Sequence, residues 1–467
     1  MKLLWYTLSY LLFFPSSLLG KKEHLNIILI FTDDQGYQDL SCFGSTAIKT
    51  PHIDRLASEG RKLTSFYVAS PVCSPSRAAL LTGCYPKRVG MHQHVLFPES
   101  AYGLNPSEYT LGKHFKENGY ATACIGKWHL GHHPEVLPRA HGFDSYYGIP
   151  YSNDMNHPDN QDRPQMGPAG MDLLWKEPET TLTKWQTPLV ENETIIEIPV
   201  DQRTITRRYT DQAISFVEKN RETPFFLYLA HSMPHIPLYL PEDHYQSNPK
   251  NAYTLVIEHI DQEVGRLVQT LESNDLDKNT LIIFTSDNGP WLHYKHHAGS
   301  AKPLRDGKST YYEGGVRVPC IVWSPSQIPA RTSSSQILST LDLLPTLANL
   351  AGTNLPENHQ CDGYDASDFL LGKTSSPRKE FIYYSSHGEL AGIRIGEWKY
   401  LAHPTPKNGK TEKNPALYNL NSDLSETTNL SSQHPEIVAQ LETRMRNADQ
   451  EITRNTRPPW RKSESLR

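Results

Sequence analysis

The sequence predicts an α/β fold with a mostly parallel or mixed central sheet sandwiched by helices. A smaller α+β unit with an antiparallel sheet is expected to follow. Over most of the chain, short apolar runs rich in β-branched residues alternate with segments of helical period, as in sheets covered by helices on both faces. After about residue 354, Pro, Gly and Ser become frequent and strand-like pieces follow one another. A chain of 467 residues is long enough for both parts.

The predicted strands of the large sheet are apolar runs without helical period. The first covers residues 25–31 (LNIILIF) and is followed closely by two aspartates. The others cover residues 120–125, 224–230, 281–284 and 318–323. Runs of this length and composition suit strands that are buried on both faces.

Helices are predicted between these strands from end signals and apolar period. Thr50 is expected to cap a helix that has Pro51 in its first position and stops at Gly60. Thr110 is expected to cap another, which stops at Gly119. Further helices are predicted over residues 205–219, 253–271 and 338–350.

The remaining segments divide the chain into parts. Residues 151–188 are rich in Pro and Asn and are predicted to form a long surface loop. Strand-like pieces cover 380–385 and 392–401, and a last helix is expected from Pro435 to about residue 450. We therefore predict three parts: a signal peptide over 1–20, a main domain over 21–355 and a small C-terminal domain over 356–467.

The N-terminus resembles an export signal. Lys2 precedes a nearly continuous apolar stretch over residues 3–14, and a small-residue region follows near Gly20. A membrane anchor is the alternative, but the stretch is shorter than the roughly 20 apolar residues that a spanning helix needs. The signal predicts a secreted or periplasmic protein without stable membrane insertion. The formal net charge of -5, with both signs interspersed, gives no reason to expect a nucleic-acid partner.

Oxygen-bearing side chains follow two of the predicted strands. Asp33 and Asp34 come after the first strand, and Asp287 and Asn288 come after the strand at 281–284. Ligands of open α/β sheets bind beyond the carboxyl ends of the strands, and carboxylate and amide oxygens suit Ca²⁺ or Mg²⁺. Ordinary turn chemistry explains either pair alone. The two pairs together favour a metal site.

A cysteine lies at the predicted start of a helix, in the segment PVCSPSRAALLTG of residues 71–83. Pro75 suits the beginning of a helix, so Cys73 is expected just before the N-terminus, where free N–H groups favour an anion. Arg77 adds a positive charge one turn further on. The alternative is a buried or disulfide-bonded cysteine, which is common in exported proteins.

Cys-x-Pro-x-Arg followed by AALLTG resembles the signature of the type I sulfatases, which are arylsulfatase-A-like members of the alkaline phosphatase superfamily. Three further segments resemble this family: GYATACIGKWH (119–129), DGKSTYYEGG (306–315) and a closing hairpin (417–430). The likeness runs from Asn26 to about Leu430. It implies an alkaline-phosphatase-like fold in which residues 21–355 form the catalytic domain.

The resemblance also implies a mechanism centred on residue 73. In this family a formylglycine-generating enzyme converts the cysteine to formylglycine (3-oxoalanine) during export. The hydrated aldehyde has one hydroxyl to attack sulfur and a second through which sulfate is expelled. Asp33, Asp34, Asp287, Asn288 and residue 73 resemble the family's ligands for Ca²⁺, with Mg²⁺ as the alternative ion.

Other family positions carry over to named residues. The catalytic set implied by the resemblance is Cys73, Arg77, Lys127, His129, His235 and Lys308. Arg77 would hold the diol and the two lysines would bind sulfate oxygens. Asp287 would help to deprotonate the attacking hydroxyl, and His129 would take the proton from the remaining one. His235 is our choice for the acid that protonates the leaving alcohol, with His231 as the alternative.

Several histidines remain. Zinc is one reading of the groups at 129–133 and 293–297, but their spacings do not form a usual zinc pattern. We therefore predict that His296 and His297, together with His231, contact substrate.

The predicted function is hydrolysis of sulfate monoesters of an aryl alcohol or a sulfated carbohydrate. One alternative is a phosphonate or phosphate ester hydrolase of the same superfamily. Another is a non-catalytic carbohydrate-binding relative with an unmodified Cys73, and a third is a cysteine hydrolase that uses its thiolate. The sequence leaves the identity of the sulfate ester open.

Overall fold

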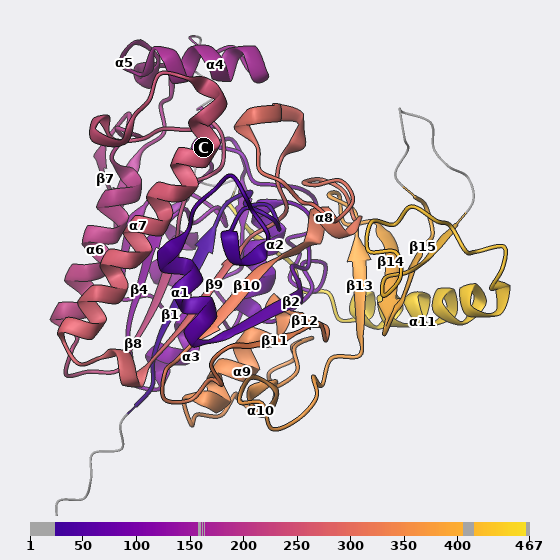
Figure 1. Ribbon diagram of the computed structural model, residues 1–467. Coiled ribbons are helices and arrows are strands. Elements are labelled where there is room, and N and C mark those ends of the chain that lie inside the picture. Colours follow the sequence, from indigo (N-terminus) through magenta and orange to yellow (C-terminus); the bar gives the residue numbers. More distant parts are fainter. Residues whose placement is uncertain (1–23, 157–159, 161, 163, 405–414, 464–467) are drawn as a thin grey trace, which may run out of the picture.

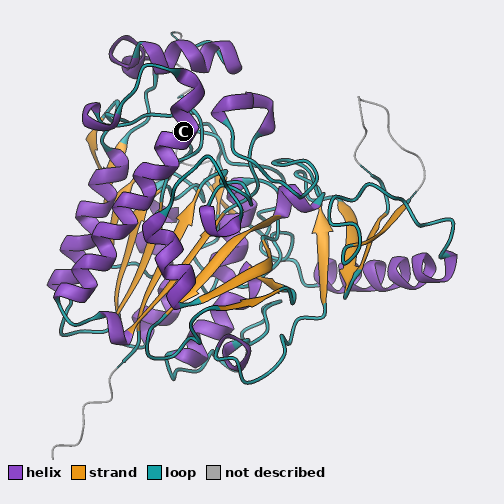
Figure 2. Cartoon of the chain, viewed as in Figure 1, coloured by secondary structure: helices purple, strands orange, loops and turns teal. Residues whose placement is uncertain are grey.

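The computed structural model describes residues 24–156, 160, 162, 164–404 and 415–463. Helices cover both faces of one large sheet, and a small sheet with a long helix lies to one side (Figures 1 and 2). The predicted signal peptide, residues 1–20, lies outside the described residues. Within the described part of the chain, no helix has the length and apolar character needed to cross a membrane.

The large sheet is mixed, as predicted. Its strand order is β11-β2-β10-β9-β1-β8-β4-β5-β6-β7, and β12 also pairs with β2. The central strands β9, β1, β8, β4 and β5 are parallel, whereas β10 is antiparallel to both β9 and β2. The strands are β1 (Asn26–Thr32), β2 (Arg61–Tyr67), β4 (Ala121–Gly126), β5 (Ser145–Gly148), β6 (Leu189–Glu191), β7 (Thr194–Glu197), β8 (Phe225–Ala230), β9 (Thr280–Ser286), β10 (Arg317–Trp323), β11 (Thr332–Ser334) and β12 (Leu338–Ser339).

Strand β1 shows why the central strands are apolar throughout. Its residues Ile27, Leu29 and Phe31 point into one hydrophobic cluster, and Ile28 and Ile30 point into the other. Successive side chains of a strand alternate between faces, so a strand with helices on both sides must be apolar at every position.

Two groups of helices cover these faces. Side chains from the first group join the cluster around Ile28, and side chains from the second join the cluster around Leu29. The first group is α1 (Pro51–Glu59), α4 (Pro168–Lys176), α6 (Ile205–Lys219) and α7 (Ala252–Ser273). The second is α2 (Cys73–Thr82), α3 (Leu111–Glu117), α9 (Leu343–Leu350) and α10 (Ser367–Leu370).

The small antiparallel sheet has the order β13-β14-β15-β16. Its strands are β13 (Glu380–Tyr384), β14 (Leu390–Ile395), β15 (Trp398–Leu401) and β16 (Ala416–Asn419). Helix α11 (Pro435–Arg454) packs on it through Leu441 and Met445, which are buried against Ile393 and Tyr400. Strand β17 (Trp460–Arg461) then pairs with β3 (Tyr102–Gly103) of the main part, and α8 (Glu313–Val316) precedes β10.

Two sequence predictions are wrong in detail. The helix expected over 338–350 begins only at Leu343, because β12 and a 3-10 turn (Thr340–Asp342) come first; Ser339 and Asp342 form a capping box on that turn. The strand expected over 392–401 is a hairpin of β14 and β15. Gly396 has a φ of 57° at its turn, a left-handed conformation that suits glycine.

The segment 151–188 also differs from the prediction of a surface loop. It contains α4, the short α5 (Pro178–Thr181) and a 3-10 turn (Leu182–Lys184). The side chains of Met171, Trp175 and Trp185 are almost fully buried. The high Pro and Asn content of the segment led to the prediction of a loop. The buried apolar residues of α4 are too few to stand out against this composition.

Candidate active site

The two acidic strand ends lie side by side. Strands β1 and β9 are parallel neighbours, with Thr32 opposite Ser286, so the residues that follow them share one edge of the sheet. The Asp34 amide donates to Asp287 Oδ1 (3.1 Å), and Asn288 Nδ2 donates to Asp34 Oδ1 (2.6 Å). The sequence prediction that these groups converge required neighbouring strands, and the structure has them.

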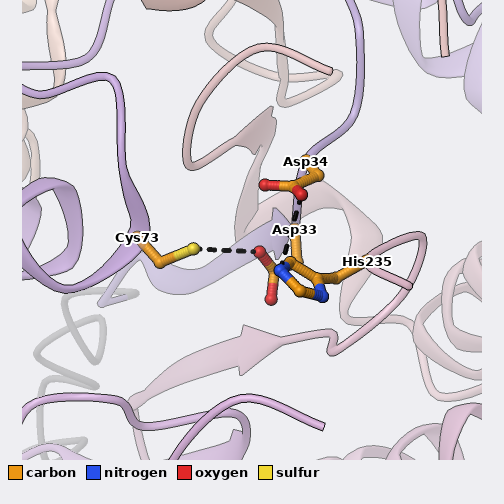
Figure 3. A group of neighbouring side chains, drawn as sticks. All are labelled: Asp33, Asp34, Cys73 and His235. Atoms are coloured by element: carbon orange, nitrogen blue, oxygen red, sulfur yellow. Dashed lines mark hydrogen bonds and ion pairs between the residues drawn. The ribbon is translucent and has the colours of Figure 1, made fainter. Parts of the chain in front are cut away.

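Cys73 is brought to the same place by α2. It is the first residue of that helix, after Val72 in extended conformation, and its side chain is buried. Its Sγ lies 3.5 Å from Asp33 Oδ1 (Figure 3). The helix thus begins two residues earlier than Pro75, and residue 73 lies among free N–H groups of the first turn.

Arg77 connects three parts of the cluster. Its Nε and Nη2 donate to Asp287 Oδ2 at 3.1 and 2.8 Å, and its Nη1 donates to the carbonyl of Lys127 at 2.9 Å. Its Nη2 also lies 3.5 Å from Asp33 Oδ2. Because the guanidinium is fully buried and fixed at both ends, it can hold neighbouring groups in position.

Two lysines pair with different carboxylates of the cluster. Lys127 Nζ, after β4, lies 2.5 Å from Asp33 Oδ2 and 3.0 Å from Ser152 Oγ. Lys308 Nζ lies 2.8 Å from the Asp34 carboxylate and 4.5 Å from the centre of the Trp291 ring. Both ammonium groups are therefore available to an anion that displaces these carboxylates or binds beside them.

The donor set fits a hard divalent cation. Asn288 Oδ1 is buried and has no hydrogen-bond partner, although its amide nitrogen is bonded. Burial, and then the charge of Asp33, raise the pKa of Asp287 to about 7. Burial also raises the pKa of Asp34, against the opposing effect of Lys308. Crowded carboxylates next to an unpartnered amide oxygen suit a hard divalent cation such as Ca²⁺ or Mg²⁺.

Two of the predicted histidines adjoin this cluster. His129 is buried, and its Nε2 lies 2.8 Å from the Leu96 carbonyl oxygen. Burial, followed by Lys127 and Arg77, lowers its pKa well below the usual value, which favours the neutral form of a base. His235 Nε2 lies 3.5 Å from Asp34 Oδ2 (Figure 3), and its Nδ1 lies 2.6 Å from the Ile236 carbonyl oxygen.

The other three predicted histidines lie elsewhere. His231 is fully buried with both ring nitrogens unpartnered, and its ring contacts that of Tyr209 in α6, with centroids 6.4 Å apart. His296 and His297 instead contact Asp172 of α4. The structure thus brings His235, and not His231, to the cluster.

Sequence reasoning missed Ser152 and Trp291 as neighbours of the two lysines. Neither belongs to a recognisable motif, and Ser152 is the second residue of the segment that was predicted to form a surface loop. The Cys73 thiol itself is a poor nucleophile here, because burial raises its pKa well above the usual value.

A central mixed sheet with this cluster at its carboxyl edge defines an ester hydrolase of the sulfatase class. The chain belongs to the sulfatase family: the family model described as Sulfatase matches residues 25–353, and the one described as N-sulphoglucosamine sulphohydrolase, C-terminal, matches residues 306–451. It is a sulfuric ester hydrolase, as predicted.

Individual relatives are similar over most of their length. Arylsulfatase A of Homo sapiens is 38% identical over 389 residues, which cover 81% of this chain and 74% of the relative. Arylsulfatase G of Mus musculus is 36% identical over 400 residues, covering 80% and 75%. The solved structure of Ps i-CgsB in complex with k-i-k-neocarrahexaose is 31% identical with a TM-score of 0.77, covering 95% of this chain and 96% of that one.

Proposed function

We propose that this sulfatase hydrolyses sulfate monoesters with residue 73, converted from cysteine to formylglycine, as the nucleophile beside a bound Ca²⁺. The observation that carries the proposal is the convergence of Cys73 with Asp33 at the start of α2, while Arg77 links the same cluster to Asp287. A formylglycine-generating enzyme would carry out this conversion during export. The predicted signal peptide accords with that route.

The implied groups have distinct tasks. Asp33, Asp34, Asp287 and Asn288, with side chain 73, would hold Ca²⁺. The ion would supply positive charge next to sulfate oxygens, and the hydrated formylglycine would supply two hydroxyls on one carbon. A serine or an unmodified cysteine at this position offers only one such group, so it cannot both attack and release the product by the same route.

The remaining residues bind the anion and move protons. Lys127 and Lys308 stabilise negative charge on sulfate oxygens from two sides, in a buried place where such charges act strongly. Arg77 keeps side chain 73 oriented through its bonds to Asp287. His129 accepts the proton of the hydroxyl that remains after attack. His235 donates a proton to the departing alcohol oxygen.

A comparison of two esters with the same leaving group tests the sulfate assignment. We expect hydrolysis of 4-nitrophenyl sulfate to exceed that of the matching aryl phosphonate at least about 100-fold in kcat/KM. Both esters carry one negative charge, but the sulfate offers three non-bridging oxygens to the two lysines and the cation, whereas the phosphonate offers two. Equal or faster hydrolysis of the phosphonate would favour the phosphonate hydrolase alternative. No turnover of any sulfate ester by the modified protein would favour the non-catalytic one.

For the substrate, we propose a sulfated carbohydrate. The similar structure Ps i-CgsB was solved with an oligosaccharide, and the matched C-terminal family is described by a sulfated amino sugar. The ring of Trp291 lies 5.7 Å from that of His235 and meets the buried Tyr294 ring edge to face at 4.8 Å. Trp291 is partly exposed and offers an aromatic surface on which a sugar ring can pack. A panel of sulfated sugars, scored by sulfate release, tests this choice.

Replacing His235 by alanine should slow poor leaving groups more than good ones. An alcohol of high pKa needs a proton as it departs, whereas 4-nitrophenolate does not. We expect kcat to fall about 100- to 10,000-fold on a sugar sulfate and less than about 10-fold on 4-nitrophenyl sulfate. His231→Ala is the matched control, and it should leave this ratio unchanged. Equal losses on both substrates in His235→Ala would exclude His235 as the acid.

A further inference from the structure

Helix α4 and a 3-10 segment meet at a second group of side chains that could hold a metal ion. Asp172 belongs to α4, near the top of Figure 1, and His296 and His297 end a 3-10 segment (Leu292–His297). The Nε2 atoms of the two histidines converge on one oxygen, Asp172 Oδ1, at 2.6 and 2.9 Å. In the part of the chain that the structure describes, this is one of two groups whose possible metal-binding atoms all lie within 4.8 Å of one another.

The backbone is shaped to bring both rings to the same point. Lys295, directly before the pair, has φ 54° and ψ -113°, a left-handed conformation that a lysine rarely adopts. The turn there places the rings of His296 and His297 4.6 Å apart. Both therefore approach the same carboxylate although they are adjacent in sequence.

The spacing is close to that of a tetrahedral metal site. Ligands about 2.0 to 2.1 Å from a tetrahedral Zn²⁺ lie about 3.3 Å from each other. The two histidine–aspartate distances would need to open by only some tenths of an ångström. His297 is buried and would anchor the site, whereas about a third of each of the Asp172 and His296 side chains is exposed, which leaves a path for an ion and for a water ligand.

We propose that Asp172, His296 and His297 form a second metal site, for a transition metal of the Zn²⁺ type. Two imidazoles and one carboxylate suit such an ion, whereas Ca²⁺ prefers an all-oxygen set such as the one around Asp33. The site is separate from the catalytic cluster, and its three ligands leave one tetrahedral position for water.

A metal at this position would tie α4 to the segment that forms one wall of the active site. Trp291 directly precedes that segment, and its ring lies 5.7 Å from that of His235 and under the Lys308 ammonium. The ion would therefore fix a substrate-facing aromatic surface without contacting the reacting atoms. The proposal does not depend on the modification of residue 73.

Zinc binding by the full-length, Ca²⁺-loaded protein tests the site. Equilibrium dialysis against Zn²⁺, followed by metal analysis, should give one equivalent more for the wild type than for Asp172→Asn or His296→Gln. Their affinity at this position should fall by at least the roughly 10- to 100-fold that loss of a supporting residue costs. Both variants change partly exposed side chains, so folding, checked by thermal unfolding, should be retained.

His293→Gln is the matched control, because His293 is exposed on the same loop and lies outside the group. It should bind as much Zn²⁺ as the wild type. Thiols elsewhere in the chain bind Zn²⁺ equally in all four proteins and cancel in the comparison. Identical stoichiometry and affinity in the wild type, Asp172→Asn and His296→Gln would overturn the proposal.

Discussion

Replacement of Cys73 by alanine should abolish sulfatase activity, lowering kcat on 4-nitrophenyl sulfate by about four to six powers of ten. Alanine cannot be converted to formylglycine, so the cluster loses its nucleophile while its cations and bases remain. The variant is then expected to bind the sulfate ester tightly without hydrolysing it, because Lys127 and Lys308 remain in the site. The measurement is the steady-state rate of the purified variant beside the wild type.

The loss should be chemical and not structural. The Cys73 thiol makes one contact in the cluster, to Asp33, so its removal should lower the melting temperature by no more than a few degrees. Cys320→Ala is the matched control: this cysteine is also fully buried, but it lies in β10 away from the charged groups. It should keep its activity. Substantial turnover by Cys73→Ala would contradict the assigned nucleophile.

Removal of the cation should lower kcat by about 100-fold or more, since metal stabilisation of this kind is worth several kcal/mol. Asp33, Asp34 and Asp287 lie together in a buried place. Burial raises the pKa of Asp34 and Asp287, so a bound cation would favour their ionised forms. Treatment with a chelator followed by an activity assay measures the loss.

Re-addition separates the two metal sites. Ca²⁺ alone should restore the full rate, because the ligands of the catalytic cluster are oxygen atoms. The hydrolysis step does not require a metal ion at Asp172, His296 and His297. Recovery with Zn²⁺ but not with Ca²⁺ would contradict the ligand assignment. Full activity in a sample shown to be free of metal would contradict the role of the cation altogether.

The sequence predicted the parts of this site that are local or that follow from strand pairing. Asp33 and Asp287 each follow an apolar run, and parallel neighbours necessarily place such residues at one edge. Cys73 and Arg77 occupy a single helix turn, so their proximity is a matter of spacing. These residues could be assigned from the sequence because their proximity depends on few contacts between distant parts of the chain.

Other features depend on contacts that no local pattern encodes. Asp172 is 124 residues away from His296, so histidine spacing alone argued against a metal there. His231 directly follows β8 and His235 lies four residues further on. The structure places His231 near Tyr209 and His235 beside Asp34, a difference that depends on the path of the chain after the strand. The helix expected from residue 338 begins only at Leu343, because a 3-10 turn with a capping box precedes it. The spacing of apolar residues does not distinguish such a turn from the first turn of a helix.

Mass analysis of residue 73 shows whether the nucleophile of this sulfatase is a formylglycine. The protein is produced together with a formylglycine-generating enzyme, and the tryptic peptide covering residues 63–77 is examined. The account predicts that the peptide has exchanged the cysteine sulfur and two hydrogens for one oxygen, and that specific activity rises in proportion to the converted fraction. Full sulfatase activity in protein whose residue 73 is entirely unmodified cysteine would contradict it.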